Sequence, residues 1–309
     1  MIVSVSSRTD IPAYFSQWFM KRVNEGYVYV RNPYYPTQIT KYLLNKDVVD
    51  CFVFCTKNPK PILKYLDQLK AYPLYFFVTV TPYDKSIEPN VPHYLEVIKD
   101  IQYLSKKLGK HNVCLRYDPI FINDIYTIEK HIHYFDEMTS LLEGYIDDCV
   151  ISFIDLYEKT KRNFPSIQEV SISQQKEIAA DFSKIALHKN IRIKTCAEQI
   201  DLSQYGISQE GCISQRILEK TIDCDLKSQK SNPLRKGCHC FVSKDIGEYN
   251  TCMHGCLYCY ANEDKQKVIT KFQQHNPFSP LLIGNIEKDD IIKQAKQESY
   301  KERQLSLDI

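Results

Sequence analysis

The sequence predicts an α/β protein built on a parallel sheet, in the form of a partial or full TIM-like barrel of the (β/α)6 type. Over residues 1–198, short apolar runs alternate with longer amphipathic stretches, which is typical of βαβ units. The apolar runs are nearly continuous, as expected for strands that are covered on both faces. The chain has only nine glycines and no glycine-rich phosphate loop, which favours a barrel over a doubly wound sheet.

The order of the elements follows from these runs. β-branched and aromatic residues in short runs indicate strands, and apolar residues at helical spacing indicate the helices between them. The predicted strands are Ile2–Ser6, Val28–Val30, Val48–Phe54, Leu74–Val80, Asn112–Arg116, Cys149–Phe153 and Ile191–Thr195. The predicted helices are Ala13–Val23, Thr37–Leu44, Pro61–Ala71, Pro92–Leu108, Ile125–Leu142 and Ser173–His188.

Polar and charged residues follow nearly every predicted strand. In α/β barrels the carboxyl ends of the strands form the rim where ligands and catalytic groups lie. For any single motif, helix capping or a turn is the simpler interpretation. Several such motifs together favour a shared polar site. The candidate ligand-binding residues are Arg8, Asp10, Lys57, Arg116, Asp118 and Glu198.

Past Glu198 the alternation of strands and helices ends. We therefore predict two parts, a barrel at residues 1–198 and a cysteine-rich segment with a charged tail at residues 199–309. The second part is expected to pack over the barrel mouth. It contains seven of the twelve cysteines of the chain. Four other cysteines, Cys51, Cys55, Cys114 and Cys149, lie in predicted strands, where we interpret them as packing residues.

The composition is that of an ordinary globular protein. The net charge of +2 argues neither for nor against nucleic-acid binding. The first residues lack the features of a signal peptide, and no stretch reaches the ~20 apolar residues that span a bilayer. We expect a cytoplasmic protein that does not bind a membrane. In a reducing compartment, cysteines are metal ligands or small buried residues more often than disulfides.

Three thiols are crowded into eight residues near the C-terminus, at Cys252, Cys256 and Cys259. The spacing C-x-x-x-C-x-x-C, with Tyr258 before the last thiol, suits one metal centre that keeps an open position. Zinc sites usually pair C-x-x-C motifs that are a dozen or more residues apart, so an iron–sulfur cluster is favoured over zinc. His254 lies inside this motif, as a hydrogen-bond donor to the cluster or as a surface residue.

The segment Cys252-Met-His-Gly-Cys256-Leu-Tyr-Cys259-Tyr-Ala resembles the cysteine motif of the radical SAM superfamily, and within it the spore photoproduct lyase branch. The whole chain resembles an uncharacterised bacterial family known as domain of unknown function 1848. The resemblance covers nearly all of residues 1–262. It is carried by two end motifs, Ser-Arg-Thr-Asp-Ile-Pro from residue 7 and Asp-Ile-Gly-Glu-Tyr-Asn-Thr-Cys from residue 245.

One departure from radical SAM enzymes is the place of the motif. Those enzymes carry their cysteines near the N-terminus, after the first barrel strand, whereas here the cysteines come last. The other landmarks keep the lyase order if the cysteine segment is imagined moved from front to back: Thr56-Lys57, Thr79-Val80-Thr81 with Glu88-Pro89, and Asp118-Pro119-Ile120. A domain whose termini lie close together tolerates such a rearrangement. No strand end resembling Gly-Gly-Glu is present.

The resemblance implies an enzyme in which Cys252, Cys256 and Cys259 hold a [4Fe–4S] cluster that binds S-adenosylmethionine. Reductive cleavage would give a 5′-deoxyadenosyl radical that takes hydrogen from an unknown substrate; a nucleotide or nucleic acid is suggested only by analogy. A flavodoxin- or ferredoxin-like electron donor is also implied. The alternative is a binding or regulatory barrel protein in which the metal is structural and no reaction is catalysed.

A second thiol group is predicted from Cys196, Cys212, Cys238 and Cys240. Cys238 and Cys240 are too close in sequence to bridge each other easily, but both can reach one metal centre. An auxiliary iron–sulfur cluster and a structural zinc are equally compatible with four thiols. The remaining interpretation is that Cys196 and Cys212 are simply buried.

Overall fold

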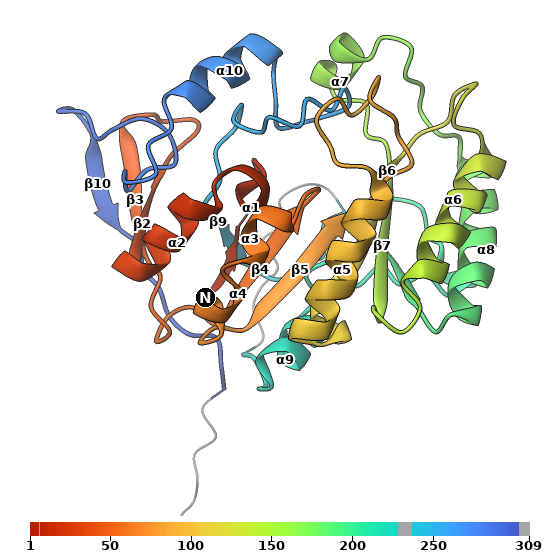
Figure 1. The fold of residues 1–309 in the computed structure, drawn as a ribbon, viewed down its shortest axis with the longest axis horizontal. Helices are drawn as coiled ribbons and strands as arrows, with labels where there is room; N and C mark the ends of the chain where they lie inside the picture. Colours follow the sequence, from red (N-terminus) through yellow and green to blue (C-terminus); the bar gives the residue numbers. More distant parts are fainter. Residues whose placement is uncertain (6, 228–236, 303–309) are drawn as a thin grey trace, which may run out of the picture.

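A computed structural model describes residues 1–5, 7–227 and 237–302 and contains one large parallel sheet (Figure 1). Its strand order is β8-β7-β6-β5-β4-β1-β9, and every neighbouring pair is parallel. The strands are β1 (Ile2–Ser4), β4 (Cys51–Thr56), β5 (Leu74–Thr79), β6 (Val113–Ile120), β7 (Asp148–Phe153), β8 (Arg192–Thr195) and β9 (Ser243–Asp245). The predicted α/β class is therefore confirmed.

The sheet is open. Within the described part of the chain, β8 and β9 are its two edges and no pairing joins them, so a closed barrel is not seen. Going across the sheet from β1 to β8, the strands follow their order in the chain, as expected for consecutive right-handed βαβ units. The expected partial barrel of the (β/α)6 type stays a prediction.

Helices fill the connections between the strands. Asp10, Thr127 and Ser171 cap three of them by accepting a backbone N–H with their side chains. The helices are α1 (Ile11–Tyr14), α2 (Ser16–Glu25), α3 (Lys60–Leu63), α4 (Leu66–Leu69), α5 (Tyr94–Leu108), α6 (Ile128–Leu141), α7 (Glu158–Asn163), α8 (Ile172–His188), α9 (Gln215–Ile222) and α10 (Lys265–Gln273). Short 3-10 turns cover Lys110–Asn112 and Ser203–Tyr205.

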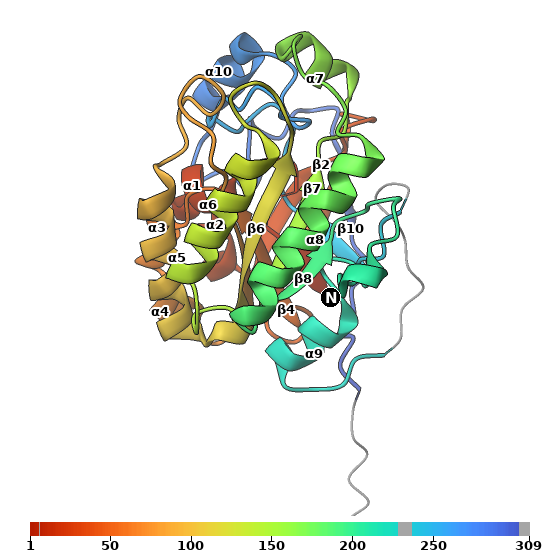
Figure 2. The same cartoon turned by 90° about the vertical axis from the view of Figure 1, so that its right-hand side faces the viewer.

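Both faces of the sheet are buried, by different parts of the chain. Alternate residues of β4 enter different apolar clusters: Phe52 and Phe54 face one, and Cys51 and Val53 face the other. The first cluster includes residues of α5, α6 and α8, and the second includes residues of α9 (Figure 2). The strand sequences are near-continuous apolar runs because both faces of the sheet are buried.

The predicted packing role of the strand cysteines agrees with this arrangement. Cys51, Cys114 and Cys149 have no solvent exposure and belong to the apolar clusters, while Cys55 is half-buried against the second cluster. All four are small side chains with an apolar surface, which suits a tightly packed sheet.

One predicted helix is wrong. The expected helix at Thr37–Leu44 is strand β3 (Gln38–Leu43), which pairs antiparallel with β2 (Tyr27–Arg31) and parallel with β10 (Ile291–Gln294). The β-branched Ile39 and Thr40 of β3 favour an extended backbone. The predicted strand Val28–Val30 exists inside β2, but it belongs to this three-stranded sheet and not to the large one.

The two ends of the described chain meet. The amino group of Met1 donates a hydrogen bond to the Glu298 carbonyl oxygen at 2.7 Å and pairs with the Asp50 carboxylate. In the large sheet, β9 lies directly beside β1, so a late segment of the chain supplies the strand next to the first one. Among the described residues, no helix has the length and apolar character needed to cross a membrane.

Candidate functional site

Asp10 joins three segments at the carboxyl edge of the sheet. Its Oδ1 accepts the Ala13 amide at 3.0 Å and caps α1. Its Oδ2 accepts the Lys57 backbone amide at 2.9 Å and lies 2.8 Å from Nε2 of His254. His254 belongs to residues 252–259, which we call the cysteine loop. Asp10 therefore ties this loop to the ends of β1 and β4.

Lys57 and Glu88 form a buried ion pair next to Asp10. Their Nζ and Oε1 atoms are 2.8 Å apart, and Thr81 donates its hydroxyl to the same carboxylate oxygen at 2.7 Å. The Tyr258 hydroxyl of the cysteine loop also donates to Glu88. Burial lowers the pKa of Lys57, but the negative charge of Glu88 and its hydrogen bond outweigh this effect, so that the Lys57 pKa is raised.

Backbone hydrogen bonds fasten the cysteine loop along the segment that follows β5. Asn90 donates its backbone amide to the His254 carbonyl at 3.1 Å and its side-chain amide to the Met253 carbonyl at 2.7 Å. The Leu257 amide donates to the Ile87 carbonyl at 3.1 Å. In Figure 1 the chain between β9 and α10 crosses above the strands, between α10 and α7. The loop thus covers the carboxyl ends of several strands.

The three thiols of the cysteine loop lie close together in a desolvated place. Burial raises the pKa of Cys252, Cys256 and Cys259 above the ordinary thiol value. The Cys252 pKa is raised further by the Asp10 carboxylate and by both other thiols. The Cys256 pKa is raised further by Glu88. Without a bound cation the thiols are therefore protonated, and any metal that binds them must displace protons.

Backbone amides point at two of these sulfur atoms. The His254 N–H hydrogen-bonds to Cys252, and the amides of Ala261 and Asn262 hydrogen-bond to Cys259; each bond lowers the pKa of its thiol. Hydrogen bonds of this kind stabilise negatively charged sulfur and tune the potential of iron–sulfur clusters. Three soft thiol donors with amide hydrogen bonds are a donor set that fits such a cluster.

A single metal ion needs ligands that meet at one point. Within the described part of the chain, no three His, Cys, Asp or Glu side chains are arranged so that they could hold one ion in common. A cubane cluster requires a different arrangement of its ligands, because each of the three thiolates binds a different iron atom. The three thiols of the cysteine loop can therefore hold a cluster without meeting at one point.

His254 is buried, with 2 % of its surface exposed, so its interpretation as a surface residue is wrong. Its Nδ1 lies 3.0 Å from the Tyr14 hydroxyl, and its Nε2 lies against Asp10. Both ring nitrogens therefore have partners outside the cysteine loop. The His254 side chain therefore anchors the cysteine loop to Asp10 and Tyr14.

The other predicted ligand-binding residues lie further along the edge. Arg8 pairs with Asp245 at the end of β9, with 3.3 Å between Nε and Oδ1. Arg116 pairs with Asp118, with 2.5 Å between Nε and Oδ2. Burial opposes the charge of Arg116, but Asp118 outweighs it and the Arg116 pKa lies well above its usual value. Arg116 therefore keeps its charge in the folded protein.

Glu198 accepts the Phe153 amide and the Ser152 hydroxyl, both at 2.9 Å. Burial raises the pKa of Glu198 to about 7 against these hydrogen bonds. The charge of Asp118 acts on both Glu198 and Lys57, so Asp118 connects the two halves of the edge. Five of the six predicted residues thus lie in one chain of neighbours, and Arg8 stands apart with Asp245.

The second predicted thiol group also comes together. The sulfur atoms of Cys196 and Cys212 are 3.8 Å apart, and those of Cys212 and Cys240 are 3.3 Å apart. Cys240 is in turn hydrogen-bonded to Cys238. Arg116 donates from Nη2 to the Cys196 sulfur at 3.0 Å. The interpretation that Cys196 and Cys212 are merely buried is therefore incomplete.

Sequence reasoning missed three polar members of the site: Thr81, Glu88 and Tyr258. The first two belong to the Thr-Val-Thr strand end and the Glu-Pro step that we used only as landmarks of chain order. A lysine that ends a buried strand needs a partner, and this was the available signal for Glu88. The role of Tyr258 depends on how the cysteine loop folds back, for which the sequence has no local signal.

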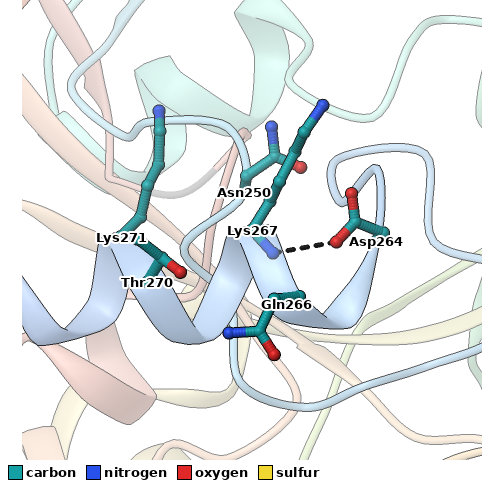
Figure 3. Close-up of a pocket in the computed structure, with 6 residues that line it drawn as sticks. All are labelled: Asn250, Asp264, Gln266, Lys267, Thr270 and Lys271. Atoms are coloured by element: carbon teal, nitrogen blue, oxygen red, sulfur yellow. Dashed lines mark hydrogen bonds between the residues drawn. The ribbon is translucent and has the colours of Figure 1, made fainter.

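A separate hollow lies on α10 (Figure 3). Its lining residues are Asn250, Asp264, Gln266, Lys267, Thr270 and Lys271. The one hydrogen bond drawn among them is the helix cap from the Lys267 amide to Asp264 Oδ1, at 2.8 Å. Because none of the thiols lines it, this hollow is not the functional site.

Comparison with known proteins identifies one family. A family model described as "Domain of unknown function (DUF1848)" matches residues 2–261. The match spans the large sheet from β1 to β9 and the complete cysteine loop. A search of curated proteins finds no match to this chain, and neither does a search of solved structures.

Proposed function

The chain belongs to the DUF1848 family, and from that premise we propose that it is an iron–sulfur enzyme of the radical SAM type. Cys252, Cys256 and Cys259 would hold a [4Fe–4S] cluster whose fourth iron binds S-adenosylmethionine. When bound and reduced, this pair of cofactors supplies a 5′-deoxyadenosyl radical that removes hydrogen from a substrate. The observation that carries the proposal is the desolvated three-thiol loop held over the carboxyl edge of a parallel sheet.

The position of β9 supports the proposal. The cysteine loop follows β9, and β9 lies beside β1 at one edge of the sheet. Counted across the sheet from that edge, the strand before the cysteines is therefore the first strand. The sequence suggests a chain in which the cysteine segment has moved from the N-terminal to the C-terminal end. Such a rearrangement requires β9 to lie beside β1 and the two chain ends to lie close together. Met1 and Glu298 are in direct contact.

The residues of this chain would do three things. Asp10 and His254 hold the loop, and the amides at His254, Ala261 and Asn262 stabilise the sulfur charges. The packing of Tyr258 in the apolar core keeps water from the back of the loop. Excluding water strengthens each electrostatic contact in the site and protects reactive intermediates.

The charged residues along the edge would bind the cofactor's amino acid and ribose groups. Lys57 and Arg116 are cations that suit its carboxylate, and Asp118 and Glu198 are carboxylates that suit its amine or hydroxyls. Both carboxylate oxygens of Asp10 are engaged, by Ala13, Lys57 and His254, so its role is to position the loop. Arg8 is engaged by Asp245 at the mouth of β9 and is the weakest of the six candidates.

The substrate is a separate question. Kinship with the lyase branch suggests a nucleotide or nucleic acid by analogy alone, and a fold does not determine a substrate. Delivery of one electron would require a small redox protein of the flavodoxin or ferredoxin kind. The competing function is a binding or regulatory protein whose metal has only a structural role.

The test is anaerobic purification followed by iron and sulfide analysis and incubation with dithionite and S-adenosylmethionine. We expect brown protein, about four irons per cysteine loop and formation of 5′-deoxyadenosine. Cys256→Ala should abolish that product, while Cys224→Ala, which changes a thiol outside both groups, should not. Colourless protein without iron, or product formation that persists in Cys256→Ala, would overturn the proposal.

A further inference from the structure

Four thiols meet on the face of the sheet that α9 covers, and they come from three separate segments. Cys196 directly follows β8, Cys212 lies in the connection before α9, and Cys238 and Cys240 precede β9. The Cys212 sulfur lies 3.8 Å from that of Cys196 and 3.3 Å from that of Cys240. The fourth thiol, Cys238, is hydrogen-bonded to Cys240.

The backbone is built to bring these segments together. The Phe241 amide donates to the Ile213 carbonyl at 2.7 Å, and the Ile213 amide points at the Cys240 sulfur at 3.5 Å. Gly211 has φ +87°, and a Cβ at this position would lie 2.6 Å from the His239 carbonyl carbon. Only glycine fits so close an approach. The contact between the two loops is therefore independent of any thiol chemistry.

The spacing distinguishes between kinds of metal centre. In a tetrahedral zinc site with bonds of about 2.3 Å, neighbouring sulfur atoms are about 3.8 Å apart. A cubane cluster holds its thiolates on different irons and spreads them more widely. The distance between Cys196 and Cys212 is that of a zinc site, and the distance between Cys212 and Cys240 is shorter still.

We propose that Cys196, Cys212, Cys238 and Cys240 bind a single zinc ion as a closed, four-thiolate structural site. The four thiols, all of them among the described residues, form a chain in this structure, and no three of them surround one point. Zinc binding would turn the cysteine side chains about their Cα–Cβ bonds until all four sulfur atoms reach the ion. A zinc ion with four thiolates carries two negative charges. The guanidinium of Arg116, 3.0 Å from the Cys196 sulfur, offsets part of that charge.

The ion would attach the late part of the chain to the sheet. Ile217 and Leu218 of α9 and the nearby Phe241 lie in the apolar cluster with Val53 and Phe77 of the sheet. Among the described residues, this covering segment has few long helices or strands. A zinc ion would join two of its parts, at Cys212 and at Cys238 and Cys240, to the end of β8. Structural zinc contributes directly to folding in this way.

The experiment measures zinc and iron separately in the full-length protein. We expect about one zinc per chain, and zinc X-ray absorption of the unaltered protein should show four sulfur ligands at about 2.3 Å. Cys212→Ser and Cys238→Ser should lose the zinc, and Cys224→Ser should keep it. Cys256→Ala should keep the zinc while it loses the iron. The absorption measurement stands even where a cysteine variant fails to fold.

Other outcomes separate this inference from the proposed function. Zinc that is lost with Cys212→Ser in a protein without iron supports the inference and contradicts the function. Iron at about eight per chain without zinc overturns the inference, because the second group then holds a cluster. A disulfide between Cys212 and Cys240 in protein purified without oxygen overturns it as well. Zinc lost in Cys256→Ala but kept in Cys212→Ser overturns both.

Discussion

The two thiol groups of this protein differ in how they are assembled. The group of Cys252, Cys256 and Cys259 lies within one loop, packed against the apolar cluster on the side of α5, α6 and α8. The group of Cys196, Cys212, Cys238 and Cys240 comes from three segments and lies against the cluster on the side of α9. Local spacing creates the first group, whereas packing of distant segments creates the second.

The difference extends to the groups around the thiols. The cysteine loop is held by buried polar bonds to Asp10 and Glu88, and two of its thiols, Cys252 and Cys259, accept hydrogen bonds from backbone amides. The second group touches the cation Arg116 and is held by a close backbone approach at Gly211. One group is thus positioned by polar side chains, and the other by the backbone.

The largest effect is expected from Lys57→Met, which leaves Glu88 buried without its cation. Breaking a buried ion pair costs about 3–5 kcal/mol in the free energy of unfolding. Because Glu88 also accepts from Tyr258, this variant should loosen the cysteine loop and leave the second thiol group intact. Denaturant unfolding measures the loss.

The double variant Lys57→Met with Glu88→Gln is the control for that prediction. It removes both charges, so it should recover much of the lost stability. If the double variant is no more stable than Lys57→Met alone, the ion pair is not what holds the loop.

A pH effect remote from both thiol groups is expected at His131, which is fully buried. It lies between the Tyr117 hydroxyl and the Phe121 carbonyl, and burial lowers its pKa from 6.5 to about 4. The unfolded chain therefore binds the proton first, and stability falls as the pH drops from 6.5 towards 4. The loss approaches roughly 3 kcal/mol.

His131→Gln should flatten this part of the stability curve, as measured by thermal unfolding between pH 7 and pH 4. His133→Gln, which changes an exposed histidine of the same helix, should leave the curve unchanged. If His131→Gln loses as much stability at low pH as the unaltered protein, His131 is not the cause of that loss. This baseline is needed before any acid lability is attributed to either thiol group.

Asp10→Ala should weaken the cysteine loop specifically. The substitution removes the contact with His254 and the acceptor for the Lys57 amide. Loss of an outer partner of a metal site typically costs 10- to 100-fold in metal affinity or activity. Iron retained after chelation should fall by about this factor, and zinc should be unaffected.

Asp264→Ala is the matched control, because Asp264 caps α10 with the same kind of hydrogen bond and lies outside the cysteine loop. Each variant loses a cap worth ~1 kcal/mol. Equal iron loss in both variants would mean that capping, and not the loop contact, accounts for the result.

The smallest effect is expected from Gly211→Ala. The new Cβ would collide with the His239 backbone, on top of the strain of a positive φ. Gly144→Ala is the control, since Gly144 has φ +78° but open space at the Cβ position. We expect Gly211→Ala to cost about 1–2 kcal/mol more in unfolding free energy than Gly144→Ala, and to weaken zinc retention alone.

Much of the fold was predictable from local pattern. Most strands of the large sheet between residues 1 and 198 appear where near-continuous apolar runs occur, because they are buried on both faces. The edge strand β8, with Arg192 and Lys194, is the exception. Segment Gln38–Leu43 was predicted as a helix because its apolar residues also fit a helical spacing, and its pairing with β2 decided the matter. The stretch of residues 225–237, whose polar and basic composition predicts a surface connection, lies partly outside the described residues.

The amino-acid sequence by itself determined the features that depend on residues close together in the chain. These are the βαβ units, the helix caps and the three-thiol motif. These depend on spacing of a few residues, which a chain carries locally. Tertiary structure alone decided that β9 lies beside β1, that Glu88 and Tyr258 meet at Lys57, and that Cys196 meets Cys212 and Cys240. Such contacts join residues up to about 240 positions apart, so they depend on the burial of whole apolar faces, which no local pattern records.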